Sequence, residues 1–490
     1  MFDHLGRLLK HSVVYGMAET ISRGISFVLV FIYVRVLSEG DLGIRTAVYV
    51  ASAFLCILYT LGLDNAFLRF FMDEELTDKK KDIFSSAFSF SLLLGILIFI
   101  AVFFQSESAS YFITKSYSYG YITRLLFMII IFDTLVIYPT LVLRAEGRFK
   151  YYSFISFARF FLFIVLNVVL VCLLKRGLKG IFEANLIVVI TVFVLLLPVF
   201  KNYFHKRISF PLLKRMFAFG IPTIFSILCM RVIDLSDRQI ILRFLGERGD
   251  IELGRYAVPY TLGMVGIMVF VHSFRLAWQP FFLSIKNNPD SRNLFSRITT
   301  YYAMFIGMVF LGITLFRKEI FSLYAPEYSL SLSKIIPFVA LAYVFFGFYI
   351  IMLAGIYIKD KTVYLPIVTF IAAALNLGLN FIFIPAFGII GAAYTTIIAY
   401  ITMVILMYVI SFITYRVNYE YKRLGIVLIS TAGTIVLSLV YKPDNVGLRF
   451  LYHTLLFLIP PMIYLYSGFL SPEEHNRLKN VIVKYVKFAK

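Results

Sequence analysis

One long apolar segment of the chain carries four ionisable residues close together. Arg231, Asp234 and Arg238 are spaced by three and four residues, and Asp237 lies beside them. This spacing places the first three on one face of a helix. Because an ionisable group near the centre of a bilayer costs at least roughly 2.5–3.5 kcal/mol, such a face must line a bundle interior or a water-filled cavity.

Other charged residues interrupt apolar segments in the same way. Glu19 and Arg23 are four residues apart and share a helix face. Asp133 and Arg159 lie midway along two further segments and have no partner on their own helix, so a structural pairing requires a second helix. Arg275 lies near the end of its segment, where a long side chain can also anchor at the membrane surface.

Together these residues predict a cationic cavity with carboxylates close by. Guanidinium groups match phosphate oxygens bidentately, so the arginines favour an anionic ligand. The candidate substrate-binding residues are Arg23, Arg159, Arg231, Arg238 and Arg275. A carboxylate facing water inside the membrane can bind and release a proton or a sodium ion. The candidate ion-coupling residues are Glu19, Asp133, Asp234 and Asp237. The alternative is that these charges form purely structural ion pairs.

The elements that position these charges are membrane-spanning helices. The chain has 490 residues, of which 60% are hydrophobic and 15% charged. This composition excludes a soluble enzyme, a disordered chain and a nucleic-acid-binding module. Continuous apolar runs of roughly 20 residues predict an all-α polytopic membrane protein with about 14 transmembrane helices. The predicted spans are 12–36, 41–63, 83–104, 122–143, 151–174, 181–200, 217–242, 253–276, 298–316, 335–358, 363–384, 388–414, 424–441 and 449–467.

Basic residues are distributed unequally between the two sides of these spans. The segments on the side of the termini contain 27 Lys and Arg residues, and the opposite loops contain 10. Lys and Arg accumulate in cytoplasmic loops, so both termini are predicted to be cytoplasmic. Residues 471–490 read as an amphipathic helix on the inner membrane surface or as a solvated basic tail.

Two stretches of the chain resemble each other six spans apart. Asp41, Leu42 and Gly43 open one span, and Glu252, Leu253 and Gly254 open another. This likeness predicts two lobes in parallel orientation with a binding site between them, although short glycine motifs also recur by chance. The expected organisation is an N-terminal six-helix lobe at 1–204, a second lobe at 205–416, two further helices at 417–470 and a cytoplasmic tail at 471–490.

Several classes of site are not indicated by the sequence. The six histidines and three cysteines lack the spacing of a metal or haem site, and no cofactor is expected. A nucleotide-binding P-loop is absent, so uphill transport must draw on an ion gradient or on substrate concentration. No loop is long enough for a soluble catalytic domain, and the chain is predicted not to be an enzyme.

The order of motifs along the chain resembles that of a known family. The motifs are Ser22-Arg23, Leu37 to Gly43, Leu143 to Arg148, Asp237-Arg238, Gly254 to Tyr256, Ala277 to Pro280, and Leu379 to Pro385 followed by Gly388 and Gly391. They are similar to those of the bacterial polysaccharide transporters, which include the O-antigen and exopolysaccharide repeat-unit flippases. These belong to a superfamily that also contains the lipid II flippase and the multidrug and toxin extruders.

The resemblance implies a V-shaped bundle of two six-helix lobes and two trailing helices, located in the inner membrane of a bacterial cell. It also implies translocation of undecaprenyl-pyrophosphate-linked oligosaccharides, with Arg23 at the position of a cavity arginine in the first helix. The implied partners are the lipid-linked substrate, membrane lipids, a coupling proton or sodium ion, and a polysaccharide polymerase with its chain-length regulator; no nucleic acid is expected. The alternatives are an ion-coupled multidrug extruder of the same fold and a membrane glycosyltransferase or polymerase.

Overall fold

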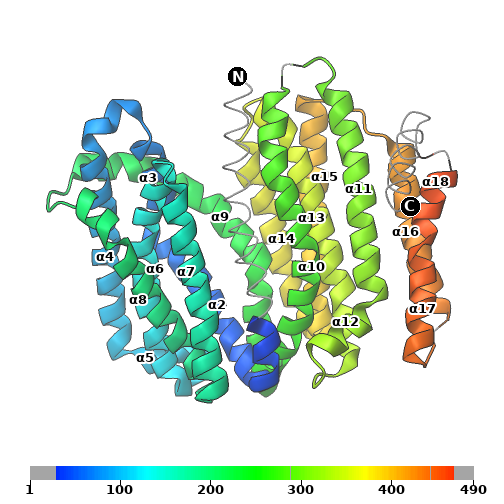
Figure 1. The fold of residues 1–490 in the computed structure, drawn as a ribbon, viewed down its shortest axis with the longest axis horizontal. Coiled ribbons are helices and arrows are strands. Elements are labelled where there is room, and N and C mark those ends of the chain that lie inside the picture. The colour runs from blue at the N-terminus through cyan, green and yellow to red at the C-terminus, as the bar shows by residue number, and fades with distance from the viewer. Residues whose placement is uncertain (1–28, 287, 442, 468, 470–490) are drawn as a thin grey trace, which may run out of the picture.

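The computed structural model describes residues 29–286, 288–441, 443–467 and 469, and these form a bundle of long helices (Figure 1). Thirteen of their helical segments are long and apolar enough to cross a membrane. The predicted all-α polytopic fold is therefore confirmed. Most of the remaining predicted span, 12–36, lies outside the described residues, but residues 29–36 are helical.

The helices form two lobes followed by a trailing group. The N-terminal lobe contains residues 29–36, α2 (Glu39–Thr60), α3 (Leu63–Phe71), α4 (Lys80–Phe104), α5 (Ser106–Thr114), α6 (Gly120–Ala145), α7 (Phe149–Asn167) and α8 (Gly177–Tyr203). The C-terminal lobe contains α9 (Phe210–Phe244), α10 (Gly249–Ser284), α11 (Ser291–Leu315), α12 (Arg317–Tyr324), α13 (Ile335–Ile358), α14 (Tyr364–Phe387) and α15 (Ile389–Thr414). The trailing helices are α16 (Tyr421–Val440), α17 (Val446–Phe457) and α18 (Ile459–Tyr466). They stand beside α11, on the outer side of the C-terminal lobe (Figure 1).

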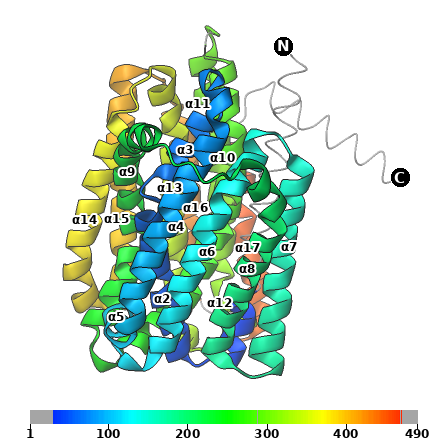
Figure 2. The same ribbon diagram turned by 90° about the vertical axis from the view of Figure 1, so that its left-hand side faces the viewer.

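The two ends of the bundle differ. The lobes meet at the lower end in Figure 1, where α2 begins and where the short helices α5 and α12 lie. We call this the closed end. Viewed with the N-terminal lobe in front, α5 lies at this end and α3 at the other (Figure 2). The opposite end carries the loops that contain most of the basic residues, and we call it the basic end.

A hydrophobic core shared by both lobes explains the closed end. Tyr33 and Ile44 of the N-terminal lobe belong to the same buried cluster as Leu262, Phe321 and Tyr324 of the C-terminal lobe. Each of these side chains is at least nine-tenths buried. Since burying a large apolar side chain contributes about 1.5–3 kcal/mol where water would otherwise reach it, this cluster holds the lobes together at that end.

Helix α9 belongs to both lobes. Its first turns place Leu213 and Met216 in the core of the N-terminal lobe. Further along, Ile233 and Ile241 lie in the core of the C-terminal lobe. Pro222 lies inside the helix, between these two parts. A proline at this position lacks the N–H that would bond one turn back, so the helix is locally weakened there.

The start and end of α2 are fixed by local chemistry. The Ser38 hydroxyl accepts a hydrogen bond from the Asp41 amide at 3.0 Å, which is a standard N-cap arrangement. At the other end Leu61 and Gly62 adopt left-handed backbone conformations, with φ of 44° and 74°. These two residues end α2 and let the chain turn into α3.

Candidate functional site

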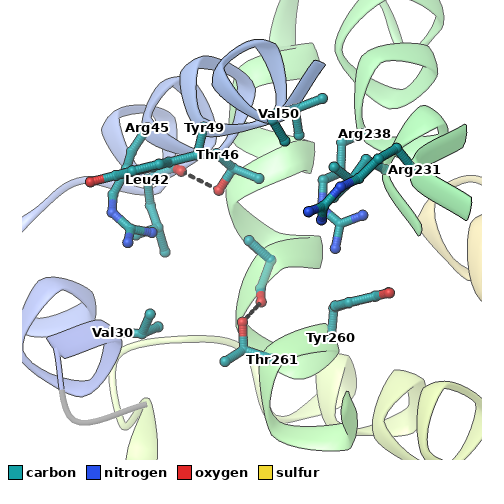
Figure 3. Close-up of a pocket in the computed structure, with 13 residues that line it drawn as sticks. Val30, Leu42, Arg45, Thr46, Tyr49, Val50, Arg231, Arg238, Tyr260 and Thr261 are labelled. Atoms are coloured by element: carbon teal, nitrogen blue, oxygen red, sulfur yellow. Dashed lines mark hydrogen bonds between the residues drawn. The ribbon is translucent and has the colours of Figure 1, made fainter. Parts of the chain in front are cut away.

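A cavity of about 270 Å³ lies between the lobes, bounded by α2 on one side and by α9 and α10 on the other (Figure 3). Three arginines line it: Arg45 from α2, and Arg231 and Arg238 from α9. Figure 3 shows Arg45 on one side of the cavity and the other two on the opposite side. Among the residues that the structure describes, no carboxylate lines this cavity, so the described part of its wall is cationic.

Arg45 was not singled out in the sequence. Its guanidinium carbon lies 4.7 Å from the ring centre of Tyr33 and 4.8 Å from that of Tyr49. These cation–π contacts hold the side chain at the wall without neutralising it. Because Arg45 follows the glycine motif at the start of a span, it reads in the sequence as a residue of the membrane surface. The only signal that could have selected it was its place within the repeated motif.

Arg231 and Arg238 share the cavity but differ in their surroundings. Arg231 is exposed and has no ion-pair partner within the described part of the chain. The Arg238 side chain is only 10% exposed and donates to Asp237 at 2.9 Å. Its guanidinium also lies 4.2 Å from the ring centre of Tyr260. Arg231 is therefore the cation that is free to bind an incoming anion, whereas Arg238 is held in place.

The two aspartates of α9 contact tyrosines of neighbouring helices. The Tyr256 hydroxyl donates to Asp237 at 2.7 Å, and the Tyr400 hydroxyl donates to Asp234. The backbone carbonyl of Asp234 accepts a hydrogen bond from Arg238. No ion pair joins Asp234 to Arg231 in the region that the structure describes. The carboxylates of this helix are thus tied to the C-terminal lobe.

Next to Asp237 lies a buried polar cluster that sequence reasoning missed. The Asn380 side-chain amide donates to the Ser236 hydroxyl at 3.3 Å and to the side-chain amide oxygen of Asn376 at 3.1 Å. The Thr395 hydroxyl donates to the amide oxygen of Asn380. Asn376 and Asn380 are four residues apart on α14, and this spacing was the available signal. The cluster joins α9, α14 and α15 in the interior of the C-terminal lobe.

Asp133 and Arg159 form an ion pair between α6 and α7, with a nitrogen–oxygen distance of 2.5 Å. The side chains are 25% and 44% exposed, so water reaches both. Asp133 lies on α6, which packs against α2. The structure therefore brings this pair to the neighbourhood of α2, although neither residue lines the cavity.

The remaining predicted residues are not in the cavity wall. Arg275 is exposed on α10, nearer the basic end, and does not line the cavity. Glu19 and Arg23 lie outside the described residues. Among the described residues, no group of three or more His, Cys, Asp or Glu side chains could hold a metal ion.

Glycine contacts flank the cavity along α2. Near the start of that helix, a Cβ on Gly43 would collide with the backbone carbonyl of Asp250, and a Cβ on Gly254 would collide with that of Glu39. The two stretches that resemble each other in sequence therefore pack backbone to backbone. Just beyond the end of α2, Gly62 and Gly220 make a similar reciprocal contact. Helices approach this closely only where no side chain intervenes.

Three arginines bridge the lobes at the closed end. Arg35 donates to the carbonyls of Leu323 and Tyr324, the last residues of α12, at 2.9 and 3.0 Å. Arg243, at the end of α9, donates to the carbonyl of Phe112 near the end of α5. Arg35 lies near the end of the helical residues 29–36, and Arg243 lies near the end of α9. Each binds the short helix of the other lobe.

The third bridge is an ion pair. Arg255 of α10 contacts Glu39 of α2 at 2.8 Å and Glu252 of its own helix at 2.9 Å. We refer to Arg35, Arg243 and Arg255 as the lobe-bridging arginines. Together with the contact between the backbones at Gly43 and Gly254 they close the space between the lobes beyond the cavity.

Comparison with known proteins supports this architecture. A family model described as "Polysaccharide biosynthesis protein" matches residues 8–286. An uncharacterized membrane protein of Methanocaldococcus jannaschii, MJ1068, is 22% identical over 412 residues, covering 77% of this chain and 79% of the relative.

Solved structures share the fold at low sequence identity. The lipid II flippase MurJ in an inward closed conformation superposes with a TM-score of 0.69 and 16% identity, covering 93% of this chain and 99% of the other. An inward-facing multidrug resistance MATE transporter of the MOP superfamily gives a TM-score of 0.63 and 16% identity, covering 84% and 95%.

Proposed function

Because the chain belongs to the family of polysaccharide biosynthesis proteins, we propose that it is a flippase for lipid-linked oligosaccharides. The proposed substrate is an oligosaccharide unit linked to undecaprenyl pyrophosphate. The protein moves this head group from the inner to the outer leaflet of the inner membrane, for synthesis of an O-antigen, a capsule or an exopolysaccharide. The chemistry is translocation, and no covalent bond is made or broken.

The arginine-lined cavity between the lobes is the observation that carries this proposal. A pyrophosphate head group loses its hydration in hydrocarbon, at a cost that an uncharged pore does not offset. Arg45 and Arg231 face each other across the cavity, and neither has an ion-pair partner among the residues that the structure describes. Guanidinium groups in this arrangement bind phosphate oxygens through charge-assisted hydrogen bonds. Arg23 and Arg159 extend the same cationic path in this proposal.

The proposed transport cycle is alternating access of the two lobes. We assign the basic end to the cytoplasm, because Lys and Arg collect on that side of membrane proteins. The structure then corresponds to a state closed toward the outer leaflet. Glu19, Asp133, Asp234 and Asp237 are the proposed carriers of a coupling proton or sodium ion.

A multidrug extruder has the same fold but a different ligand charge. Its ligands are usually cationic and favour an acidic or aromatic binding site. The described part of the cavity wall contains three arginines and no carboxylate, which disfavours a cation. The charge of the wall therefore separates the two functions.

Transport can be tested with the full chain reconstituted in vesicles that contain a fluorescent undecaprenyl-pyrophosphate oligosaccharide. The substitution Arg231→Gln removes one charge-assisted hydrogen bond to the substrate, worth about 1.5–3 kcal/mol. The variant should therefore translocate the substrate roughly 10- to 150-fold more slowly than the unmodified chain. Arg297→Gln is the matched control, because Arg297 is exposed and lies outside the cavity. Equal rates for both variants, or transport of cationic dyes alone, would refute the proposal.

A further inference from the structure

A second cationic pocket lies at the basic end of the C-terminal lobe, far along the chain from the cavity residues. It has a volume of about 400 Å³. It is formed by described residues between α10 and α11, the first turn of α11, the end of α13 with the residue after it, and the residue after α15. Lys286, Arg292 and Lys359 line it, with Ser291 and Tyr415 between them. The proposed transport route does not use this pocket.

The described residues that line the pocket include three cations and no carboxylate. Asp290 and Asp360 belong to the same loops but do not line it, and neither is joined to the three cations by an ion pair in the described part of the chain. Like charges held close together repel each other unless a counter-charge is bound. The three positive charges of the pocket therefore lack a counter-charge and favour the binding of an anion.

Some other arginines of this protein are neutralised by a carboxylate. Arg176 binds Glu183 at 2.5 Å, and Arg449 binds Glu319 at 2.5 Å. Arg292 instead lies over the ring of Tyr415, 5.1 Å from its centre. This stacking holds the guanidinium group in place and leaves its N–H donors free for a ligand.

The pocket wall contains two buried hydroxyl groups and the N-terminus of a helix. The hydroxyls of Ser291 and Tyr415 are 2.8 Å apart, and both residues are buried. Helix α11 begins at Ser291, so the positive end of its dipole lies at the pocket. A helix N-terminus together with basic side chains is an arrangement that binds phosphate groups.

We propose that this pocket binds the phosphate group of an anionic molecule at the basic end of the C-terminal lobe. Basic pockets between transmembrane helices at the cytoplasmic surface bind anionic lipid head groups. A lipid head group such as that of phosphatidylglycerol and a soluble phosphate compound offer the same oxygens. The phosphate accepts hydrogen bonds from Arg292 and both lysines, and it neutralises the cluster.

The test uses the purified full chain and two probes. Native mass spectrometry measures retention of phosphatidylglycerol against phosphatidylcholine, and calorimetry measures binding of inorganic pyrophosphate. The pocket variant is Lys286→Gln with Lys359→Gln, which leaves the contact between Arg292 and Tyr415 intact. The matched control is Lys201→Gln with Lys206→Gln, two exposed lysines at the basic end of the N-terminal lobe.

Each basic residue near an anionic head group contributes about fivefold to affinity, so the pocket variant should bind at least about tenfold more weakly than the control. Loss of phosphatidylglycerol alone identifies a lipid as the ligand, and loss of pyrophosphate binding identifies a soluble phosphate site. Equal binding by the pocket variant and the control, or no binding of either probe by the unmodified chain, would overturn the proposal.

Discussion

Two groups of arginines lie between the lobes, and they differ in what they contact. The lobe-bridging arginines at the closed end donate to helix-terminal carbonyls or to Glu39. In the cavity, Arg45 contacts the rings of two tyrosines, and Arg231 is exposed. No ion pair joins either arginine to any residue that the structure describes. The lobe-bridging arginines stabilise the closed arrangement of the lobes, whereas the cavity arginines keep their positive charge available for a ligand.

Arg238 is the exception that makes this comparison testable, because it lines the cavity and yet is paired. Asp237→Ala would leave a buried guanidinium without its counter-charge and should lower the free energy of unfolding by about 3–5 kcal/mol. Denaturant titration in mixed micelles measures this change. Asp133→Ala is the control, and it should cost about 1 kcal/mol or less, since its partner Arg159 is 44% exposed. Similar losses in both variants would show that Arg238 is not held by its pair.

The closed end can be opened without touching a charge. Gly254→Val places a side chain against the Glu39 carbonyl and should disfavour the closed arrangement by about 1–3 kcal/mol or more. Pulsed electron paramagnetic resonance between spin labels at Lys115 and Glu327 would report a longer distance. Gly433→Val is the control, because a Cβ there meets nothing within 4 Å. An unchanged distance between the labels in Gly254→Val would show that the closed arrangement does not depend on this glycine contact.

Removal of a helix-capping arginine should have a smaller effect. Arg35→Gln removes a cation from the C-terminal end of α12, and Arg243→Gln does the same at α5. Each should disfavour closure by about 1–2 kcal/mol, which is the upper range for a charge at a partly buried helix terminus. The same pair of spin labels measures the population of the open state. If only one variant has an effect, the two bridges are not equivalent.

The ion pair of Arg255 should contribute least. Its side chain is 41% exposed and Glu39 is 29% exposed, so Arg255→Gln should cost about 0.2–1 kcal/mol. This effect should shrink further at high salt, because water and ions screen the pair. The closed-state population at low and high ionic strength gives the measurement. A loss as large as that of Arg35→Gln would contradict the order proposed for the three bridges.

The spans were predictable because a bilayer requires every backbone polar group to be bonded within its own segment. Apolar runs therefore mark helices directly, as the match between the predicted span 335–358 and α13 shows. Helical spacing also placed Arg231 and Arg238, seven residues apart, on one face, and both line the cavity.

Partners on other helices could not be predicted in the same way. The sequence gives no reason for Asp234 to contact Tyr400, which is 166 positions away. Arg45 was missed because its role depends on Tyr33 and on the opposite lobe. Such contacts depend on how helices pack, and helical periodicity describes only one helix at a time.

Helix α9 has a consequence for any motion between the lobes. Met216 is buried in the core of the N-terminal lobe and Ile233 in that of the C-terminal lobe, so this one helix connects both lobes. When the lobes tilt apart, α9 must bend or lose its contacts with one of the two cores. The missing backbone bond at Pro222, next to the bare backbone of Gly220, is where flexing costs least. If the lobes rock as proposed, we expect the pivot to lie within this continuous helix rather than in a loop.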